Sequence, residues 1–319
     1  MSKQISIIGL NQIGASIGLG LAAQDKEYYR VGYDRDVKTG PQAVHSGAIE
    51  KSFFNLPSAV EKADIIALSV PMDEIKAALS VIGPAMQKGA VIIDTSPLKK
   101  SVEEWAVEMV PQGCSFVSIS PTLNPESFLD NTPSADLFKN SLIVITAPKG
   151  TGEDIIEMVI GLADTLGAKT MFSDPVENDG LIAAVKTLPE LVAASLVHAT
   201  ADLPGWLESR KLAGAAFANG SAPLQSMSGT ESPCDDILYN QANTLRVIDN
   251  LISSLNDLRD HIADGRQKEL NEFIISARDI RNSWIIQRQS ADWEKSGEKV
   301  QPPDFMSRLF GSRGKPVKS

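Results

Sequence analysis

The 319-residue sequence is poor in the side chains that bind metals and form covalent cross-links. Its two cysteines, Cys114 and Cys234, form no C-x-x-C pair, so we expect no disulfide framework and a reducing, cytoplasmic location. The three histidines, His45, His198 and His261, lie far apart and in no ligand motif. The sequence therefore predicts no metal site built from protein ligands.

The chain also lacks long apolar runs and an excess of positive charge. No apolar run approaches the roughly 18–20 residues of a transmembrane helix, and a strand pattern from residue 4 leaves no room for a signal peptide. The formal net charge of −10 and a pI near 4.9 argue against general nucleic-acid binding. We therefore expect a globular protein of one large or two ordinary domains, with neither membrane nor nucleic acid among its partners.

A glycine turn between an apolar strand and a helix opens the chain. Residues 4–8 are a short β-branched run typical of a buried strand, and residues 15–23 continue in the small residues of a helix. The turn between them is G-L-N-Q-I-G, where a dinucleotide-binding βαβ unit has G-x-G-x-x-G. We predict that it holds a pyrophosphate on the N–H groups of the helix N-terminus through Gly9, Asn11, Gln12, Ile13 and Gly14.

Asn11 stands where the second glycine of that motif is usual. Asparagine tolerates unusual backbone angles better than most residues, and we expect the loop shape to survive for that reason.

A carboxylate follows the second strand at the spacing that a ribose ligand requires. Residues 29–33 form this strand, and Asp34 follows it directly, twenty residues after Gly14. A carboxylate at that place bonds the ribose 2′-hydroxyl of NAD. Arg35 and Lys38 follow at once and would suit the 2′-phosphate of NADP, so the sequence leaves NAD and NADP open.

Strands and helices alternate as far as about residue 172. Further runs typical of buried strands lie at residues 63–70, 90–95, 115–119, 141–147 and 169–172. This alternation predicts an α/β fold with a doubly wound, mostly parallel dinucleotide-binding sheet, whose ligand lies at the carboxyl ends of the strands. Four residues that end two of these strands are further predicted cofactor contacts, namely Ser69, Val70, Pro71 and Thr95.

Two stretches of this half lack a strand or helix pattern. Residues 51–56 are typical of a crossover connection, and residues 120–134, rich in proline and asparagine, are typical of a long functional loop.

From residue 174 the strand signals vanish and long helical patterns follow. These cover roughly residues 175–201, 205–212, 235–263 and 267–284, and Pro189 is expected to kink the first. Their apolar stripes predict helix packing within the subunit and a homodimer interface. We expect a dinucleotide-binding, Rossmann-like domain at 1–173, an all-helical substrate and dimerisation domain at 174–290, and a flexible tail at 291–319.

Several segments together resemble the prephenate/arogenate dehydrogenase family. They are I-I-G-L-x-x-I-G-x-S-I-G-L at residues 7–19, S-V-P at 69–71, V-I-I-D-T at 91–95, and A-V-K-T-L-P-E-L-V-A-A-S-L at 184–196. The resemblance covers about residues 3–285. It implies an NAD(P)-linked dehydrogenase of tyrosine biosynthesis that oxidises a cyclohexadienyl alcohol, a small carboxylate substrate, with loss of CO₂.

The acid–base residues of that family are replaced in this chain. The position of the catalytic histidine falls at Ser120, and the family's S-H-L-P-H falls at K-T-L-P-E, which places Lys186, Thr187 and Glu190 there. A serine or threonine hydroxyl does not replace an imidazole as a base near pH 7. We therefore predict that the usual mechanism is not used, and we take these four residues as the candidate catalytic ones.

Two further family motifs are also altered. The D-x-x-S-x-K motif begins at Asp94, with Pro97 in place of the serine and Lys99 retained. The family's T-R-I-A motif falls near residues 226–229, and residues 211–245 contain no arginine. The arginine that the family uses to bind the substrate carboxylate is therefore missing from its usual place.

Three interpretations remain open. In the first, the protein is a dehydrogenase of this family with displaced catalytic groups, for which His198 and His261 are candidates. Alternatively, it acts on a different hydroxy or keto acid with Lys186 as acid or base, since related hydroxyacid dehydrogenases place such a lysine four residues before an asparagine. Glu190 takes the asparagine position here, on the same helical face. The third interpretation is a nucleotide-binding pseudoenzyme without catalysis.

Overall fold

The computed structural model describes residues 3–24, 28–123, 132–226 and 234–290. The chain divides into two compact units, residues 1–175 with 276–319 and residues 176–275. The predicted tail at 291–319 and residues 124–131 of the predicted functional loop lie outside the described residues.

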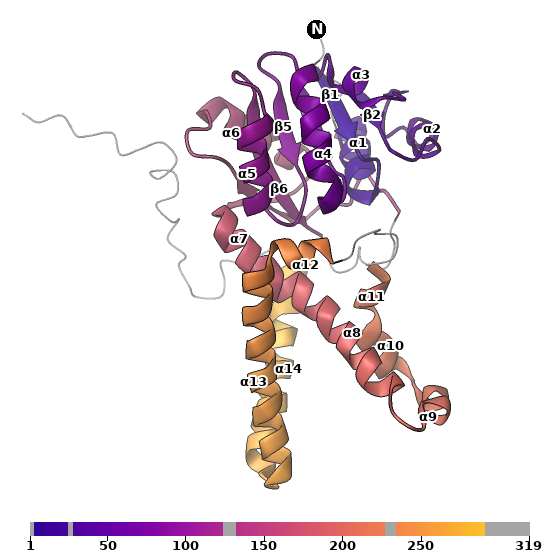
Figure 1. The fold of residues 1–319 in the computed structure, drawn as a ribbon, viewed down its shortest axis with the longest axis vertical. Coiled ribbons are helices and arrows are strands. Elements are labelled where there is room, and N and C mark those ends of the chain that lie inside the picture. Colours follow the sequence, from indigo (N-terminus) through magenta and orange to yellow (C-terminus); the bar gives the residue numbers. More distant parts are fainter. Residues whose placement is uncertain (1–2, 25–27, 124–131, 227–233, 291–319) are drawn as a thin grey trace, which may run out of the picture. The chain divides into compact units, whose positions relative to one another are not determined.

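An eight-stranded sheet forms the centre of the first unit (Figure 1). The strand order is β3-β2-β1-β4-β5-β6-β7-β8, and every neighbouring pair is parallel except β6 and β7. This topology confirms the predicted doubly wound, mostly parallel sheet. The strands are β1 (Lys3–Ile8), β2 (Tyr28–Tyr33), β3 (Lys51–Ser52), β4 (Ile65–Leu68), β5 (Val91–Asp94), β6 (Ser115–Thr122), β7 (Leu142–Thr146) and β8 (Lys169–Phe172).

Central strands of this sheet are buried on both faces. All four residues of β4 and all four of β5 are buried, as the continuous apolar runs of a covered parallel sheet require. Helix α1 packs beside α6, while α4 packs beside α3 and α5. The helices of this unit are α1 (Gln12–Gln24), α2 (Thr39–His45), α3 (Leu56–Val60), α4 (Met72–Ile82), α5 (Lys100–Met109) and α6 (Glu153–Thr165), with a 3₁₀ turn η1 (Gly83–Ala85).

The predicted crossover at residues 51–56 contains an additional strand. β3 pairs with β2 through two residues only, which is too short for any periodicity to reveal it. Helix α3 then begins behind Asn55, whose Oδ1 accepts a hydrogen bond from the Ser58 N–H at 2.9 Å. The prediction of a segment without strand or helix is therefore wrong at residues 51–52, which form β3, and at Leu56, where α3 begins.

Every regular element in the described residues of the second unit is a helix, as predicted. A π-helical segment stands just before Pro189, where the kink is predicted, because proline lacks an N–H and its ring needs room near the carbonyl of Val185. The helices are α7 (Pro175–Ile182), the π segment η3 (Ala183–Thr187), α8 (Leu188–Ala201), α9 (Trp206–Leu212), α10 (Ala215–Ser221), α11 (Pro223–Ser226), α12 (Asp235–Tyr239), α13 (Gln241–Ala263) and α14 (Gln267–Ser290), and α14 passes into the first unit at Ser276.

One helical stretch, Pro175–Ala201, is long and apolar enough to cross a membrane by length and composition alone, and 17% of its most apolar window is buried. This differs from the expectation that no apolar run approaches that length, because small and hydroxyl residues separate its apolar ones. Lys186 and Glu190 lie within the stretch, and charges deep in a bilayer are costly. Exposed apolar residues are equally typical of helices that pack against a second subunit.

Glycine in α1 allows the helix to lie close to neighbouring backbone. A Cβ on Gly18 would lie 2.2 Å from the carbonyl oxygen of Ala48, whereas one on Gly161 in α6 would meet nothing within 4 Å. We expect Gly18→Ala to lower the free energy of unfolding by about 1–3 kcal/mol through overpacking. The matched control Gly161→Ala should raise it by up to about 1 kcal/mol through helix propensity. Urea unfolding of both variants measures the difference, and equal effects would contradict the contact.

Candidate functional site

Two glycines shape the turn after β1. Gly9 has a φ of +87°, which favours glycine, and a Cβ there would lie 2.1 Å from the carbonyl oxygen of Ser69. A Cβ on Gly14 would lie 2.0 Å from the carbonyl oxygen of Gly9. The first turn of α1 is therefore in close contact with the end of β1, and the residue that follows β4 closes the turn from the other side.

Asn11 holds this turn through its side chain. Its Oδ1 accepts hydrogen bonds from the Gly14 N–H and the Ser69 hydroxyl, each at 3.0 Å, and its Nδ2 donates to the Ser69 carbonyl at 2.7 Å. Asn11 therefore caps α1 and ties it to the end of β4. Among the described residues, Asn140 is the non-glycine with positive φ. The loop keeps its shape by side-chain hydrogen bonds rather than by the unusual backbone angles that were the expected reason.

Asp34 lies directly after β2 and faces the same turn. Its Oδ2 accepts a hydrogen bond from the Leu10 N–H at 2.7 Å, and its Oδ1 accepts one from the Asp36 N–H at 2.9 Å. The carboxylate is thus fixed beside the glycine turn before any ligand arrives.

A cavity of about 460 Å³ opens beside the glycine turn. Its walls include seven of the predicted cofactor contacts: Gly9, Asn11, Asp34, Arg35, Ser69, Val70 and Pro71. The other four line no part of it. Gln12, Ile13 and Gly14 form the first turn of α1, whose leading N–H groups precede the first intrahelical bond, and Thr95 follows β5, where its hydroxyl donates to the Leu68 carbonyl at 3.2 Å.

Sequence reasoning missed the wall that α4 contributes. Glu74, Ala77, Ala78 and Val81 line the cavity at positions i, i+3, i+4 and i+7, and Leu56 adds an apolar contact. The 3.6-residue period of the helix was the signal that would have found this stripe.

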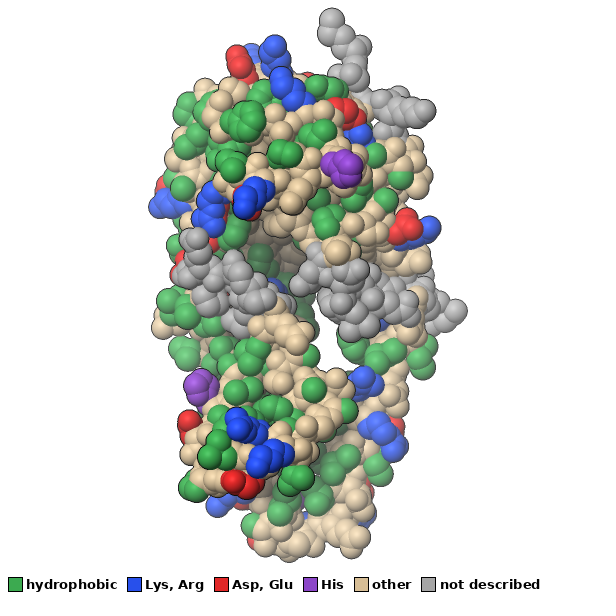
Figure 2. All heavy atoms as spheres, turned by 90° about the vertical axis from the view of Figure 1, so that its right-hand side faces the viewer, with side chains coloured by type: hydrophobic (Ala, Val, Ile, Leu, Met, Phe, Trp, Pro, Cys, Tyr) green, Lys and Arg blue, Asp and Glu red, His purple; other side chains and the backbone are tan. Residues whose placement is uncertain are grey.

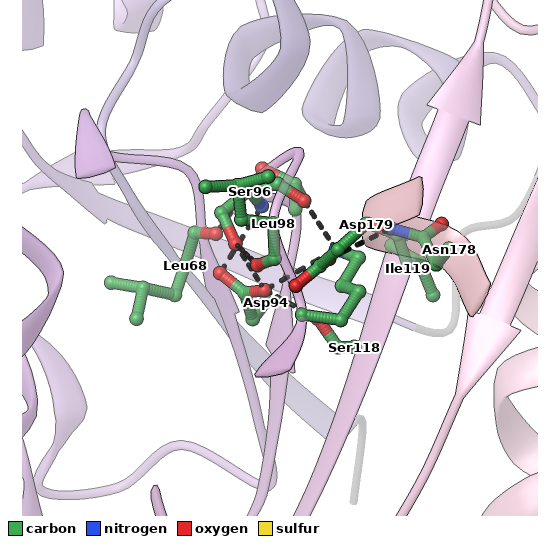
Figure 3. A network of polar contacts seen from close by, with 10 residues as sticks. Leu68, Asp94, Ser96, Leu98, Ser118, Ile119, Asn178 and Asp179 are labelled. Atoms are coloured by element: carbon green, nitrogen blue, oxygen red, sulfur yellow. Dashed lines mark hydrogen bonds and ion pairs between the residues drawn. The ribbon is translucent and has the colours of Figure 1, made fainter. Parts of the chain in front are cut away.

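A buried polar cluster lies at the carboxyl end of β5 (Figure 3). Asp94 accepts hydrogen bonds from the hydroxyls of Ser96, at 2.7 Å, and Ser118. The Lys99 Nζ lies 3.4 Å from the Asp94 Oδ2 and donates to the carbonyl of Ile119 at 2.8 Å. Both charged side chains are fully buried, so each needs the other to offset its desolvation.

This cluster supports the strand that carries Ser120. Ser120 is a buried residue of β6 and pairs with Val144 of the antiparallel β7, so the predicted loop does not begin there. Pairing with β7 extends β6 through Pro121 as far as Thr122, which the proline-based prediction of a loop did not anticipate. Lys99 therefore fixes the backbone immediately before the candidate catalytic serine.

The end of β6 has a second cationic contact, from the far end of the chain. Arg288, in the last turns of α14, is buried and donates through Nη2 to the carbonyls of Thr122 and, at 2.7 Å, Leu123. No sequence pattern links these residues, which lie more than 160 positions apart.

The other candidate catalytic residues lie in the second unit. Lys186 Nζ is 3.6 Å from the Glu190 Oε1 and 3.3 Å from the Asp236 Oδ2. Thr187 is buried in the π segment next to it. The predicted Lys186–Glu190 pair is present, and Asp236 is a further member that the sequence did not indicate.

The carboxyl of Glu190 has a perturbed pKa. Burial raises the pKa of the Glu190 carboxyl; Lys186 lowers it in part, and Asp236 raises it again. The Glu190 side chain is 13% exposed and that of Lys186 is 42% exposed. A carboxyl with a raised pKa accepts a proton more readily near neutral pH than an ordinary one.

Neither His198 nor His261 takes part in the contacts described for Lys186, Glu190 and Asp236. His198 is exposed near the end of α8, and His261 lies in the last turn of α13. Within the part of the chain that the structure describes, no group of three or more His, Cys, Asp or Glu side chains is placed to hold a metal ion.

The glycine turn, Asp34 and the parallel sheet define a dinucleotide-binding α/β protein with a helical second unit. Residues 17–172 match the family described as prephenate dehydrogenase, nucleotide-binding domain, and residues 174–275 match prephenate dehydrogenase, dimerization domain. The chain belongs to the prephenate dehydrogenase family, which confirms the resemblance found in the sequence. It is therefore an NAD(P)-dependent dehydrogenase by family.

Curated relatives share less than a quarter of their residues with this chain. The prephenate dehydrogenase of Bacillus subtilis is 23% identical over 295 residues, which cover 91% of this chain and 78% of the relative. The cyclohexadienyl dehydrogenase of Zymomonas mobilis is 24% identical over 266 residues, which cover 82% and 89%.

Solved structures show the same fold. Prephenate dehydrogenase from Aquifex aeolicus, in complex with hydroxyphenyl propionate and NAD⁺, superposes with a TM-score of 0.79 at 19% identity, covering 89% of this chain and 98% of that one. Synechocystis arogenate dehydrogenase superposes with a TM-score of 0.71 at 23% identity, covering 88% and 99%.

We expect Asp34→Ala to weaken NADH binding about ten- to hundredfold, because a hydrogen bond to a charged group contributes roughly 1.5–3 kcal/mol. Asp34→Asn keeps an oxygen acceptor for the Leu10 N–H and separates the effect of charge from that of loop order. The control is Asp36→Ala, which removes a nearby exposed carboxylate that does not line the cavity. Calorimetric titration measures the affinities, and an unchanged affinity in Asp34→Ala would show that this carboxylate is not the ribose ligand.

Proposed function

We propose that the protein is a dehydrogenase that binds NAD in the cavity beside β1 and oxidises a small carboxylate substrate of the prephenate or arogenate type. The observation that carries the proposal is that the glycine turn and the Asp34 carboxylate line the same cavity. The residues present fit a dinucleotide. Gly9 and Gly14 let the first turn of α1 pack against the end of β1 and the residue after β4, which sets the N-terminus of α1 beside the cavity, and Asp34 supplies an acceptor for a ribose hydroxyl.

Each part of the turn has a separate task in this proposal. The N-terminus of α1, including Gln12 and Ile13, would hold the pyrophosphate through backbone N–H groups and the helix dipole. Ser69, Val70, Pro71 and Thr95, at the carboxyl ends of β4 and β5, would border the rest of the nucleotide. When bound, NAD⁺ accepts a hydride from the carbon that carries the substrate hydroxyl.

This oxidation releases a proton from the substrate hydroxyl, and the chain must accept it. Ser120 and Thr187 carry hydroxyls, which are weak bases at neutral pH. Glu190 has a carboxyl whose pKa burial raises, and Lys186 lies beside it. We assign the proton to Glu190 as general base, with Lys186 holding the carboxylate in place and Thr187 orienting the substrate by a hydrogen bond.

A second candidate is a dehydrogenase for a different hydroxy or keto acid. The observation that favours it is the Lys186–Glu190 pair, which stands where the family has S-H-L-P-H. In that case Lys186 acts as the acid or base that transfers the proton, and Glu190 holds the Lys186 side chain in position. A nucleotide-binding protein without turnover is the remaining outcome of the same assay.

For its assembly we propose a homodimer through the helical domain at 174–290, in the cytoplasm. Apolar side chains are exposed along one face of α13, at Leu245, Ile252, Leu255 and Ile262. Their spacings of seven, three and seven residues form a seam of the kind that packs against another helix. Figure 2 shows hydrophobic side chains exposed over the helical unit, while the basic side chains on that face of the described residues lie scattered.

The first experiment is a titration of NAD⁺, NADH, NADP⁺ and NADPH into the purified protein, followed by turnover assays with prephenate and arogenate. We expect binding with turnover, read by the absorbance of the reduced nicotinamide. Binding with turnover only on other hydroxy acids would favour the second candidate. Binding without any turnover would point to the pseudoenzyme, and no binding would refute the proposed function.

We expect Glu190→Gln to reduce kcat by about 10²–10⁴-fold, the usual contribution of a general base, with NADH affinity unchanged. The exposed Glu208→Gln is the charge-matched control. Because the carboxylate form must be present, kcat should fall as pH decreases through the raised pKa of Glu190, and Glu190→Gln should lose this limb of the profile. A retained limb would assign the proton to another group, and Lys186→Met then tests the second candidate.

We expect Ile252→Glu to raise the dimer dissociation constant at least about tenfold, because the dimer would bury an unpaired charge. Ser253→Glu adds the same charge to an exposed neighbour outside the seam. Sedimentation equilibrium of both variants gives the association constants. A dimer that tolerates both substitutions equally would place the interface elsewhere.

A further inference from the structure

The cavity beside β1 has a charged rim as well as an apolar wall. Ala77, Ala78 and Val81 form a wall of small apolar side chains on α4, and Glu74 lies one turn before them on the same stripe. Glu74 sits in the first turn of α4, where the helix dipole stabilises its negative charge. It is therefore the charged end of a face that is otherwise apolar.

Glu74 forms an ion pair with the arginine that follows the ribose carboxylate. The Arg35 Nη1 lies 2.8 Å from the Glu74 Oε1, and the two side chains are 61% and 27% exposed. Both residues line the cavity together with Asp34. The guanidinium next to the expected ribose site is thus held by a carboxylate from α4.

The charge at this rim is unfavourable for a second phosphate. The charged residues among the described cavity walls are Asp34, Glu74 and Arg35, two carboxylates and one guanidinium. An adenosine 2′-phosphate is accepted where an arginine is available to it. Here Arg35 would have to exchange Glu74 for the phosphate, and both carboxylates would repel the incoming charge.

We propose that Glu74 is a specificity-determining residue that makes this site select NAD(H) over NADP(H), because it engages Arg35 and adds a second negative charge to the rim. The inference rests on the proposed function, since it concerns the same cofactor cavity. It names a residue on α4, outside the glycine turn and outside the strand that carries Asp34.

Binding of NADH and NADPH at fixed ionic strength tests this inference without any substrate. We expect the unaltered protein to bind NADH at least about tenfold more tightly than NADPH. Glu74→Gln should strengthen NADPH binding about tenfold, with NADH affinity changed less than about threefold. Adding Arg35→Met to Glu74→Gln should remove the gain, since no guanidinium then remains to bind the phosphate.

Asp73→Asn is the matched control, because it removes the same charge from the adjacent, exposed residue that does not line the cavity. An equal gain in NADPH affinity from Asp73→Asn would overturn the inference, since it would reflect net charge alone. So would an unaltered protein that prefers NADPH, or a Glu74→Gln variant with unchanged NADPH affinity. The absence of binding to any nicotinamide dinucleotide would refute the proposed function together with this inference.

Discussion

The close approach of backbone to backbone at the end of β1 is the constraint on which the rest of the site depends. Gly9 lies against the carbonyl of Ser69, and Gly14 lies against the carbonyl of Gly9, at distances that leave no room for a Cβ. The same contact brings the N-terminus of α1, the end of β4 and the carboxylate of Asp34 to one cavity. Asn11 reinforces the contact with hydrogen bonds rather than loosening it.

The fold and the candidate chemistry of this chain stand differently toward the family. The fold is that of the family, whereas the sequence has Ser120, Thr187 and Glu190 at the positions where the resemblance predicts histidines. Ser120 stands on a strand fixed by the buried Lys99–Asp94 pair, so its surroundings are rigid even though its side chain is not a base. Next to the π segment, by contrast, a partly buried carboxyl and a lysine are adjacent.

The sheet was predictable because buried parallel strands carry continuous apolar runs between turn residues. Predictions from sequence pattern and spacing failed where the pairing of one strand with its neighbour, rather than its own composition, decides the structure. The two residues of β3 are too few to show a period, and β6 continues through Pro121 because β7 is there to receive it. For the site, the spacing from Gly14 placed Asp34 correctly beside the glycine turn. The Glu74 ion pair was not visible, because it depends on how α4 packs against the end of β2.

The Arg288 contact means that the chain is not a simple succession of two separable modules. Its last described helix returns to the first unit and satisfies backbone carbonyls at the end of the strand that carries Ser120. A fragment ending near residue 175 would contain the whole sheet and still lack one of its buried cations. An exchange of nucleotide-binding domains between relatives would therefore need two junctions in each chain, one on either side of the helical insert.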